Sequence, residues 1–200
     1  MTRFFYDSEF LEDGKTIELI SIGIVSETGR EYYAVNDEAP WARIARHDWL
    51  MDNVVPQLPM TDNRQKAFSP ELPLDLTHPC VKAPYIIAQE VRQFLLGSWQ
   101  PGLMAGDPPP VELWAWYGAY DHVRLMQLWG RMIDRPQGIP MWTNDLRQEV
   151  HRLGDPKLPL QTSGEHDALE DARWLKWRWE WLRERSSICG SVTQSCTTGA

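Results

Sequence analysis

The sequence predicts an α/β fold, in which a mixed sheet is flanked by helices. Two observations lead to this fold class. Three strand-like runs follow one another within the first 36 residues, with short turns between them. The rest of the chain alternates helical periodicity with one further short apolar run. An antiparallel meander followed by alternating helices and strands is typical of a sheet that gains parallel strands and carries helices on both faces.

The meander is predicted from the pattern of each run. Residues 3–9 are aromatic and alternate in polarity, as a strand does. Residues 17–25 are a β-branched and mostly apolar run, which is typical of a strand buried on both faces. A turn over residues 26–29 then leads into a third strand over residues 31–35.

The middle of the chain is less regular. Residues 40–55 are expected to be partly helical and to end at Pro56, and residues 56–84 hold six prolines and are expected to be mostly loop. Residues 85–96 predict an amphipathic helix, followed by a Gly/Pro connector over residues 97–110. The apolar face of this helix consists of Ile87, Val91, Phe94 and Leu95.

The C-terminal part alternates again between strand and helix. Residues 111–116 predict a short strand and residues 119–129 the helix after it. A further helix is expected over residues 143–153, with Thr143 or Asn144 as its N-cap. The longest helix is expected over residues 166–185. Residues 186–200 are rich in Ser, Thr and Gly and are expected to be a disordered tail, so the folded domain is predicted to be residues 1–185.

The last helix has two apolar stripes, which predicts two contacts. The first follows 4-3-4-3 spacing and is expected to face the core: Ala168, Ala172, Leu175, Trp179 and Leu182. The second is roughly opposite and consists of Trp174, Trp177 and Trp181. A helix that is apolar on two sides is either enclosed in one fold or buried in a partner, and we expect the tryptophan stripe to form a homodimer contact.

Composition places the chain among soluble globular proteins of one domain. It has 200 residues, of which 42% are hydrophobic and 24% charged. No apolar run approaches the roughly 20 residues that a membrane span needs, and the first residues do not resemble a signal peptide. The three cysteines, Cys80, Cys189 and Cys196, form no disulfide framework and no zinc-site spacing. We therefore expect a cytoplasmic protein with reduced thiols and no membrane partner.

The net charge of −8 argues against a protein that coats nucleic acid, but less so against an enzyme that acts at one strand end. A protein that coats a nucleic-acid backbone is normally basic. An enzyme that holds a few nucleotides at one strand end needs much less positive charge, and metal ions in its site would offset the carboxylates there.

Asp7 and Glu9 are the first candidate functional residues. Side chains alternate across a strand, so these two carboxylates point the same way. They repel each other unless a cation lies between them. A solvated strand end is the alternative, but residues 4–6 are aromatic and too apolar for an exposed edge. Oxygen ligands at the end of a buried strand favour magnesium or manganese.

Three later residues complete the candidate site. Asp121 is expected in the first turn of a helix, where an acidic residue is also common for its interaction with the helix dipole. Asp171 lies one turn into the last helix, beside its core face. His166 lies where loop becomes helix, and a histidine with a near-neutral pKa suits a base that deprotonates water. His47 has the same spacing to Asp52, but it precedes Asp121 and is interpreted as a surface residue.

The order Asp-x-Glu, central Asp and terminal His-x-x-x-x-Asp resembles the DEDDh exonucleases of the ribonuclease H-like (DnaQ-like) superfamily. Four longer runs, at residues 4–10, 16–23, 113–122 and 166–169, are similar to the mycobacterial-type polyadenylate-specific exoribonucleases. The similarity covers residues 1 to about 185. It is strong in these runs and weak in residues 40–84 and 130–164.

This resemblance implies a five- or six-stranded ribonuclease H-like sheet, a homodimer, and two Mg²⁺ ions with Mn²⁺ as a substitute. It implies hydrolysis of single-stranded RNA from the 3′ end to nucleoside 5′-monophosphates, with polyadenylate as a preferred substrate. By position, His166 would be the general base and the metal ligands would be Asp7, Glu9, Asp121 and Asp171. Candidate contacts to the terminal nucleoside are Phe10, Trp116 and Tyr120, for the last two of which core packing is the alternative.

Three other functions are compatible with the residues. A 3′-5′ DNA exonuclease of the proofreading type would use the same chemistry, because discrimination depends on contacts to the 2′-hydroxyl. A non-catalytic dimeric nucleic-acid-binding scaffold would be indicated by a missing ligand or base, and none is missing. A sugar-phosphate or nucleotide hydrolase with the same metals is consistent with the acidic net charge.

Overall fold

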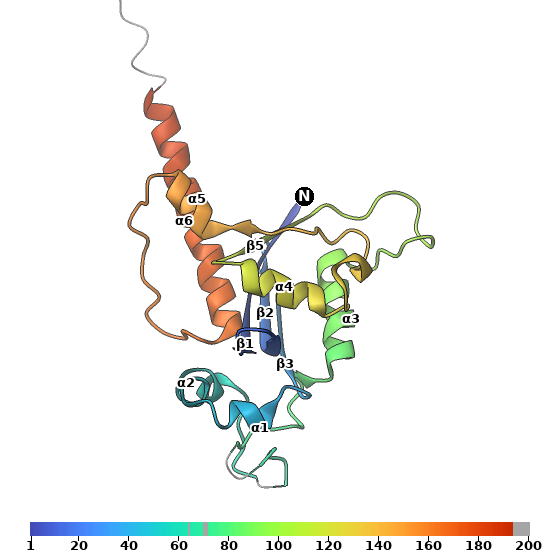
Figure 1. Ribbon diagram of the computed structural model, residues 1–200. Coiled ribbons are helices and arrows are strands. Elements are labelled where there is room, and N and C mark those ends of the chain that lie inside the picture. The colour runs from blue at the N-terminus through green and yellow to red at the C-terminus, as the bar shows by residue number, and fades with distance from the viewer. Residues whose placement is uncertain (64, 70–71, 194–200) are drawn as a thin grey trace, which may run out of the picture.

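The computed structural model describes residues 1–63, 65–69 and 72–193, and it has the predicted α/β architecture. One six-stranded sheet has the order β4-β3-β2-β1-β5-β6. Its strands β1, β2, β3 and β5 are labelled in Figure 1. Strands β1 (Thr2–Glu12), β2 (Ile17–Ser26) and β3 (Glu31–Asn36) form the antiparallel meander. Strands β5 (Val111–Ala115), β6 (Asn144–Asp145) and β4 (Val81–Lys82) add parallel pairs at the two sides. The sheet is therefore mixed, as predicted.

Helices cover both faces of the sheet. Helices α3 (Pro84–Leu96) and α4 (Ala119–Gln127) pack on one face, against a core that includes Phe4, Tyr6 and Ile22. Helices α5 (Leu146–Arg152) and α6 (Ala168–Thr193) pack on the other face, against Phe5 (Figure 1). A third cluster joins β3 to α1 (Trp41–Ile44), α2 (Asp48–Asn53) and the short helix Val55–Gln57. Another short helix spans Met132–Asp134.

The predicted start of the helix at residues 143–153 is wrong. Asn144 and Asp145 pair with β5 as the last strand, and the helix begins at Leu146. Asn144 uses its side-chain amide to bind the Leu113 carbonyl, so it supports the sheet and does not cap the helix. Asp145 is the N-cap, because its carboxylate accepts the Arg147 N–H at 2.8 Å. Strand pairing thus takes precedence over the local capping signal.

The last helix also differs from its predicted bounds. It begins at Ala168, because His166 has a φ of +67°, which a helix does not allow. It continues to Thr193, so the predicted tail boundary at residue 186 lies within a helix, while residues 194–200 lie outside the described residues. No helix in the described ranges has the length and apolar character needed to cross a membrane.

Gly23 determines how close α6 lies to the sheet. It pairs with Asp7 across β1 and β2. A Cβ atom at Gly23 would lie 2.2 Å from the carbonyl oxygen of Ala168 and 2.4 Å from the Leu169 nitrogen. Only a glycine permits this approach of backbone to backbone. The first turn of α6 therefore rests directly on β2, next to the carboxylates of β1.

The two predicted stripes of α6 have different outcomes. The core stripe is confirmed, because Ala168, Ala172, Leu175 and Leu182 are buried and Trp179 packs with them. The tryptophan stripe divides. Trp174 and Trp177 lie edge to face at 5.1 Å, and Trp177 is 41% exposed. Trp181 is partly buried and packs on the Phe5 cluster of the same chain.

Candidate active site

The carboxyl-terminal half of β1 supplies two acidic side chains on one face. Asp7 is partly buried and Glu9 is buried. Ser8 points to the opposite face, as alternation along a strand requires. The register with β2 shifts between Glu9 and Phe10. Such an irregularity bends a strand and reorients its side chains, and it is frequent beside active sites.

Asp121 is brought to the same place by α4. It lies in the first turn of that helix, is only 7% exposed, and binds β1 directly. One of its carboxylate oxygens accepts the Ser8 N–H at 2.9 Å and the Ser8 hydroxyl at 2.6 Å. The middle residue of the Asp-x-Glu motif therefore fixes the third carboxylate, which comes from 113 residues further along the chain.

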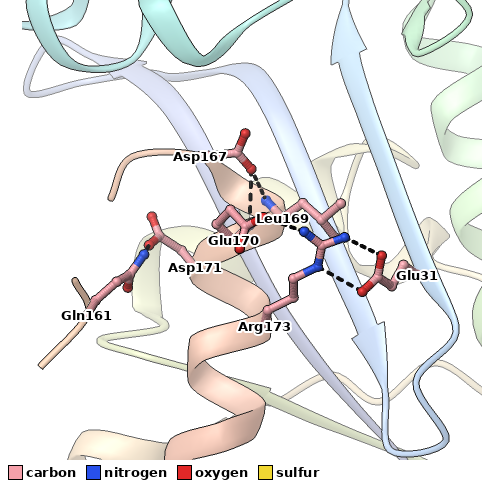
Figure 2. Close-up of polar contacts among 7 residues, drawn as sticks. All are labelled: Glu31, Gln161, Asp167, Leu169, Glu170, Asp171 and Arg173. Atoms are coloured by element: carbon pink, nitrogen blue, oxygen red, sulfur yellow. Dashed lines mark hydrogen bonds and ion pairs between the residues drawn. The ribbon is translucent and has the colours of Figure 1, made fainter. Parts of the chain in front are cut away.

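The first turn of α6 is held by polar contacts of Asp167 and Arg173. Asp167 accepts the N–H groups of Leu169 and Glu170 and so caps the helix (Figure 2). Arg173 binds Glu31 of β3 through its Nε at 2.8 Å and also binds Glu170 (Figure 2). These contacts fix the position from which Asp171 extends.

Both oxygens of Asp171 accept a hydrogen bond. The Gln161 side-chain amide donates to Oδ1 at 2.7 Å (Figure 2). The His166 backbone N–H donates to Oδ2 at 3.0 Å, from a residue whose backbone is left-handed with a φ of +67°. Glu9, His166 and Asp171 each offer a ligand atom within 4.8 Å of the others.

Trp49 is a site residue that sequence reasoning missed. It lies on α2, is 48% exposed, and its ring meets the His166 imidazole edge to face at 4.8 Å. Its segment has weak periodicity, so the only signal was a tryptophan directly after a helix start. His47 is exposed and lies outside the site, as predicted, but its Nδ1 accepts the Leu50 N–H and caps the helix that carries Trp49.

All five residues predicted for the chemistry border one cavity of about 270 Å³. They come from β1, α4 and the start of α6, which are far apart in the sequence. The cavity is lined by Asp7, Ser8, Glu9, Phe10, Trp49, Asp121, His166 and Asp171.

The carboxylates in this cavity repel one another, and no Lys or Arg side chain among the described residues that line it offsets their charge. Burial, followed by repulsion from Asp171 and Asp121, raises the pKa of Glu9 to about 8. Burial raises the pKa of Asp121 to about 6, although the Ser8 hydrogen bonds act in the opposite direction. Burial and the neighbouring carboxylates also raise the pKa of Asp7, and burial raises that of Asp171. Neither Lys nor Arg is among the described residues that line the cavity.

This donor set fits a divalent cation. Four carboxylates that converge without a Lys or Arg partner are stabilised when a metal ion lies between them. Oxygen ligands suit Mg²⁺ or Mn²⁺ better than zinc or copper.

The three candidate substrate contacts lie in different surroundings. Phe10 borders the cavity and stacks on Tyr120 with ring centroids 6.0 Å apart and planes at 13°. Tyr120 is exposed beside it. Trp116 does not border the cavity but packs on the Phe5 cluster, with the Arg178 guanidinium over its ring at 5.4 Å. Phe10 and Tyr120 thus form a stacked aromatic pair beside the cavity, whereas Trp116 lies outside the cavity lining.

Comparison with known proteins identifies the family of the chain. No protein-family model matches the chain. Two curated proteins of Mycobacterium tuberculosis, from strains CDC 1551 / Oshkosh and ATCC 25618 / H37Rv, are both named 3′-5′ exoribonuclease. Each is 42% identical over 171 residues, which cover 86% of this chain and 87% of the relative. The chain therefore belongs to the family of these mycobacterial 3′-5′ exoribonucleases.

Proposed function

We propose that this protein is a magnesium-dependent 3′-5′ exoribonuclease of the DEDDh type, which releases nucleoside 5′-monophosphates from the 3′ end of RNA. The observation that carries the proposal is the convergence of four carboxylates and one imidazole on a single cavity. Two relatives that are 42% identical over 171 residues are named 3′-5′ exoribonuclease.

Asp7, Glu9, Asp121 and Asp171 would hold two Mg²⁺ ions, with Mn²⁺ as a substitute. When bound, such ions polarise the scissile phosphate and make a nucleophile available from water at neutral pH. The protein contributes the fixed positions of the oxygens: Ser8 orients Asp121, and Gln161 with the His166 N–H orients Asp171.

His166 is the proposed general base. Its imidazole lies at the cavity beside Glu9 and Asp171, and contact with the Trp49 ring limits its movement. It would take the proton from the water whose oxygen attacks phosphorus. The bond from phosphorus to the 3′-oxygen of the preceding nucleotide then breaks, and that oxygen receives a proton as the nucleoside monophosphate leaves.

The aromatic residues at the cavity would hold the terminal nucleoside. Phe10 and Tyr120 present stacked rings on one side of the site, and Trp49 presents a half-exposed ring at His166. Base stacking on such rings is sequence-tolerant, so a preference for polyadenylate would need additional polar contacts. A proofreading-type DNA exonuclease remains the alternative, because contacts to the 2′-hydroxyl decide between the two substrates.

Incubation with end-labelled oligo-A, oligo-U and oligo-dA in the presence of Mg²⁺ tests the proposal. We expect 5′-labelled RNA to shorten one nucleotide at a time from its 3′ end, with oligo-A degraded fastest and oligo-dA slowest. Preferential degradation of oligo-dA would favour the DNA exonuclease, and the absence of cleavage in all three would favour the scaffold.

We also propose a homodimer, formed through the groove that Trp174 and Trp177 line with Glu170 and Arg173. The groove has a volume of about 440 Å³ and a mainly apolar floor. Sedimentation of a Trp177→Glu variant should show a monomer and the wild type a dimer. A wild type that is monomeric at micromolar concentration would contradict this contact.

A further inference from the structure

Helix α6 continues beyond the catalytic cavity, and two arginines further along it lie on the same side of the helix as Asp171. Arg178 and Arg185 follow it at intervals of seven residues. Seven residues make almost two helical turns, so the three side chains leave the helix on the same side, about 10 Å apart along its axis. Figure 1 shows α6 running from the end of β1 that holds the site and projecting past the sheet.

These two arginines differ from other basic residues of the helix. Arg173 is bound to Glu31 and Glu170, and Lys176 to Glu180. Within the described ranges, by contrast, neither Arg178 nor Arg185 has a carboxylate within ion-pair distance. The Nε of Arg178 is buried without a hydrogen-bond partner. These guanidinium groups therefore keep donors that the fold does not use.

Both guanidinium groups lie over tryptophan rings. Arg178 lies over Trp116 at 5.4 Å, and Arg185 lies over Trp181 at 3.8 Å. Stacking on an aromatic face uses the plane of the guanidinium and leaves the N–H groups along its edge available. An arginine that is already oriented loses less conformational entropy when it binds a phosphate. This arrangement suits phosphate groups that pass along the helix.

The local charge is opposite to that of the whole chain. Residues 174–185 carry four basic and two acidic side chains, a local charge of +2, in a chain with a net charge of −8. A polyanion that approaches the acidic cavity would be repelled by much of the surface but attracted by this part of α6.

We propose that the RNA segment on the 5′ side of the terminal nucleotide runs along α6, with its phosphates bound by Arg178 and Arg185. This inference rests on the proposed exoribonuclease function and assigns the path of the strand outside the catalytic cavity. Trp116 then acts on RNA indirectly, as the platform that holds Arg178. A dinucleotide is too short to reach these arginines, whereas a longer oligonucleotide reaches both.

The test compares kcat/KM for a diribonucleotide and for a dodecaribonucleotide over a series of salt concentrations. Arg178→Gln and Arg185→Gln should each lower kcat/KM for the dodecamer about tenfold, which is the scale of one charge-assisted hydrogen bond. Each should also reduce the salt dependence by about 0.7 in the log–log slope, as expected for one lost phosphate contact to a single strand. The dinucleotide should be cleaved as by the wild type.

Arg30→Gln is the matched control. Arg30 is also stacked on an aromatic ring, that of Phe94 at 4.7 Å, and has no carboxylate partner among the described residues, but it lies on the side of the sheet covered by α3. We expect this variant to have the wild-type kcat/KM for both substrates. Arg178→Lys provides a second variant, which keeps the charge and should keep most of the salt dependence.

Three outcomes would overturn the proposal. Equal losses of kcat/KM for the two substrates would mean that the arginines stabilise the fold or the catalytic cavity and do not bind the RNA strand. An unchanged salt slope for the dodecamer would exclude phosphate contacts. If either variant changed from dimer to monomer in sedimentation while the ratio of kcat/KM for the two substrates stayed that of the wild type, this face of α6 would be a contact with a second copy of the chain. Failure of the exoribonuclease function itself is distinct, because the wild type would then cleave neither RNA.

Discussion

The two ends of β1 carry charge in opposite ways. At the amino end, Arg3 forms an ion pair with Glu27 at 3.0 Å and lies 3.4 Å from Glu112. At the carboxyl end, Asp7 and Glu9 meet other carboxylates, and neither Lys nor Arg is among the described residues that border their cavity. At the amino end, the opposite charges neutralise one another within the protein. At the carboxyl end, the negative charges have no such partner in the cavity lining.

The proposed site does not lie at the larger of the two cavities that border β1. The amino end borders a cavity of about 380 Å³ between α5 and α6, larger than the 270 Å³ at the carboxyl end. In the larger cavity, Arg152 is bound to Glu149 and Arg3 to its acidic neighbours. Like charges that destabilise the isolated fold persist where a ligand compensates them. The uncompensated charge is therefore the better indicator of a site than the volume.

The strongest test of this contrast removes one carboxylate at each end. Asp171→Ala or Asp7→Ala should abolish turnover of oligo-A while the protein remains folded, because each removes a proposed metal ligand. Excess EDTA should have the same effect on the wild type. Glu112→Gln, at the amino end, should leave turnover nearly unchanged. Full activity in EDTA would refute the metal-dependent mechanism.

A second test separates the base from the ligands at the carboxyl end. His166→Ala should lower turnover about 10²- to 10⁴-fold, the usual scale of general-base catalysis. Calorimetric affinity for Mn²⁺ should remain nearly unchanged, because the four carboxylates remain. A large loss of affinity would instead make His166 a metal ligand. His151→Ala is the preferred control, because His151 is exposed and hydrogen-bonded to Asp155, whereas His47 supports the helix of Trp49.

A third test concerns the support of a single carboxylate. Gln161→Leu removes the donor to Asp171 Oδ1 and should weaken Mn²⁺ binding about 10- to 100-fold, as is typical when the hydrogen-bond partner of a metal ligand is lost. Gln127→Leu, which removes a surface contact to Arg124, should have no such effect. Equal Mn²⁺ affinities in the two variants would show that Asp171 needs no orientation.

The smallest expected effect is on stability without metal. The raised pKa values mean that the folded protein binds more protons than the unfolded chain, from about the ordinary pKa of each acid up to about 8 for Glu9 and about 6 for Asp121. Stability in EDTA should therefore fall as pH rises from about 4.5 to 8.

Thermal unfolding in EDTA across this pH range measures the effect. Glu9→Gln should have a higher Tm than the wild type near pH 8 and a flatter pH profile. A Tm that rises with pH in the wild type would mean that the carboxylates are compensated by groups within the protein, and the contrast between the two ends of β1 would disappear.

Local sequence patterns were sufficient to predict the strands of the meander, the fold class and the core stripe of α6. These features depend on local periodicity, which each segment encodes in its own residues. Alternation along β1 also placed Asp7 and Glu9 on one face, and the spacing in α6 placed Asp171 beside its core stripe. The resemblance supplied the grouping of these residues with Asp121 and His166.

The way in which these segments meet depends on contacts that form only in the folded protein. Gly23 admits the first turn of α6, Ser8 binds Asp121 from 113 residues away, and Trp49 reaches His166 from α2. Strand pairing moved the cap of α5 to Asp145, and packing on the Phe5 cluster divided the tryptophan stripe. Each of these depends on contacts between segments distant in sequence, for which no local pattern carries a signal.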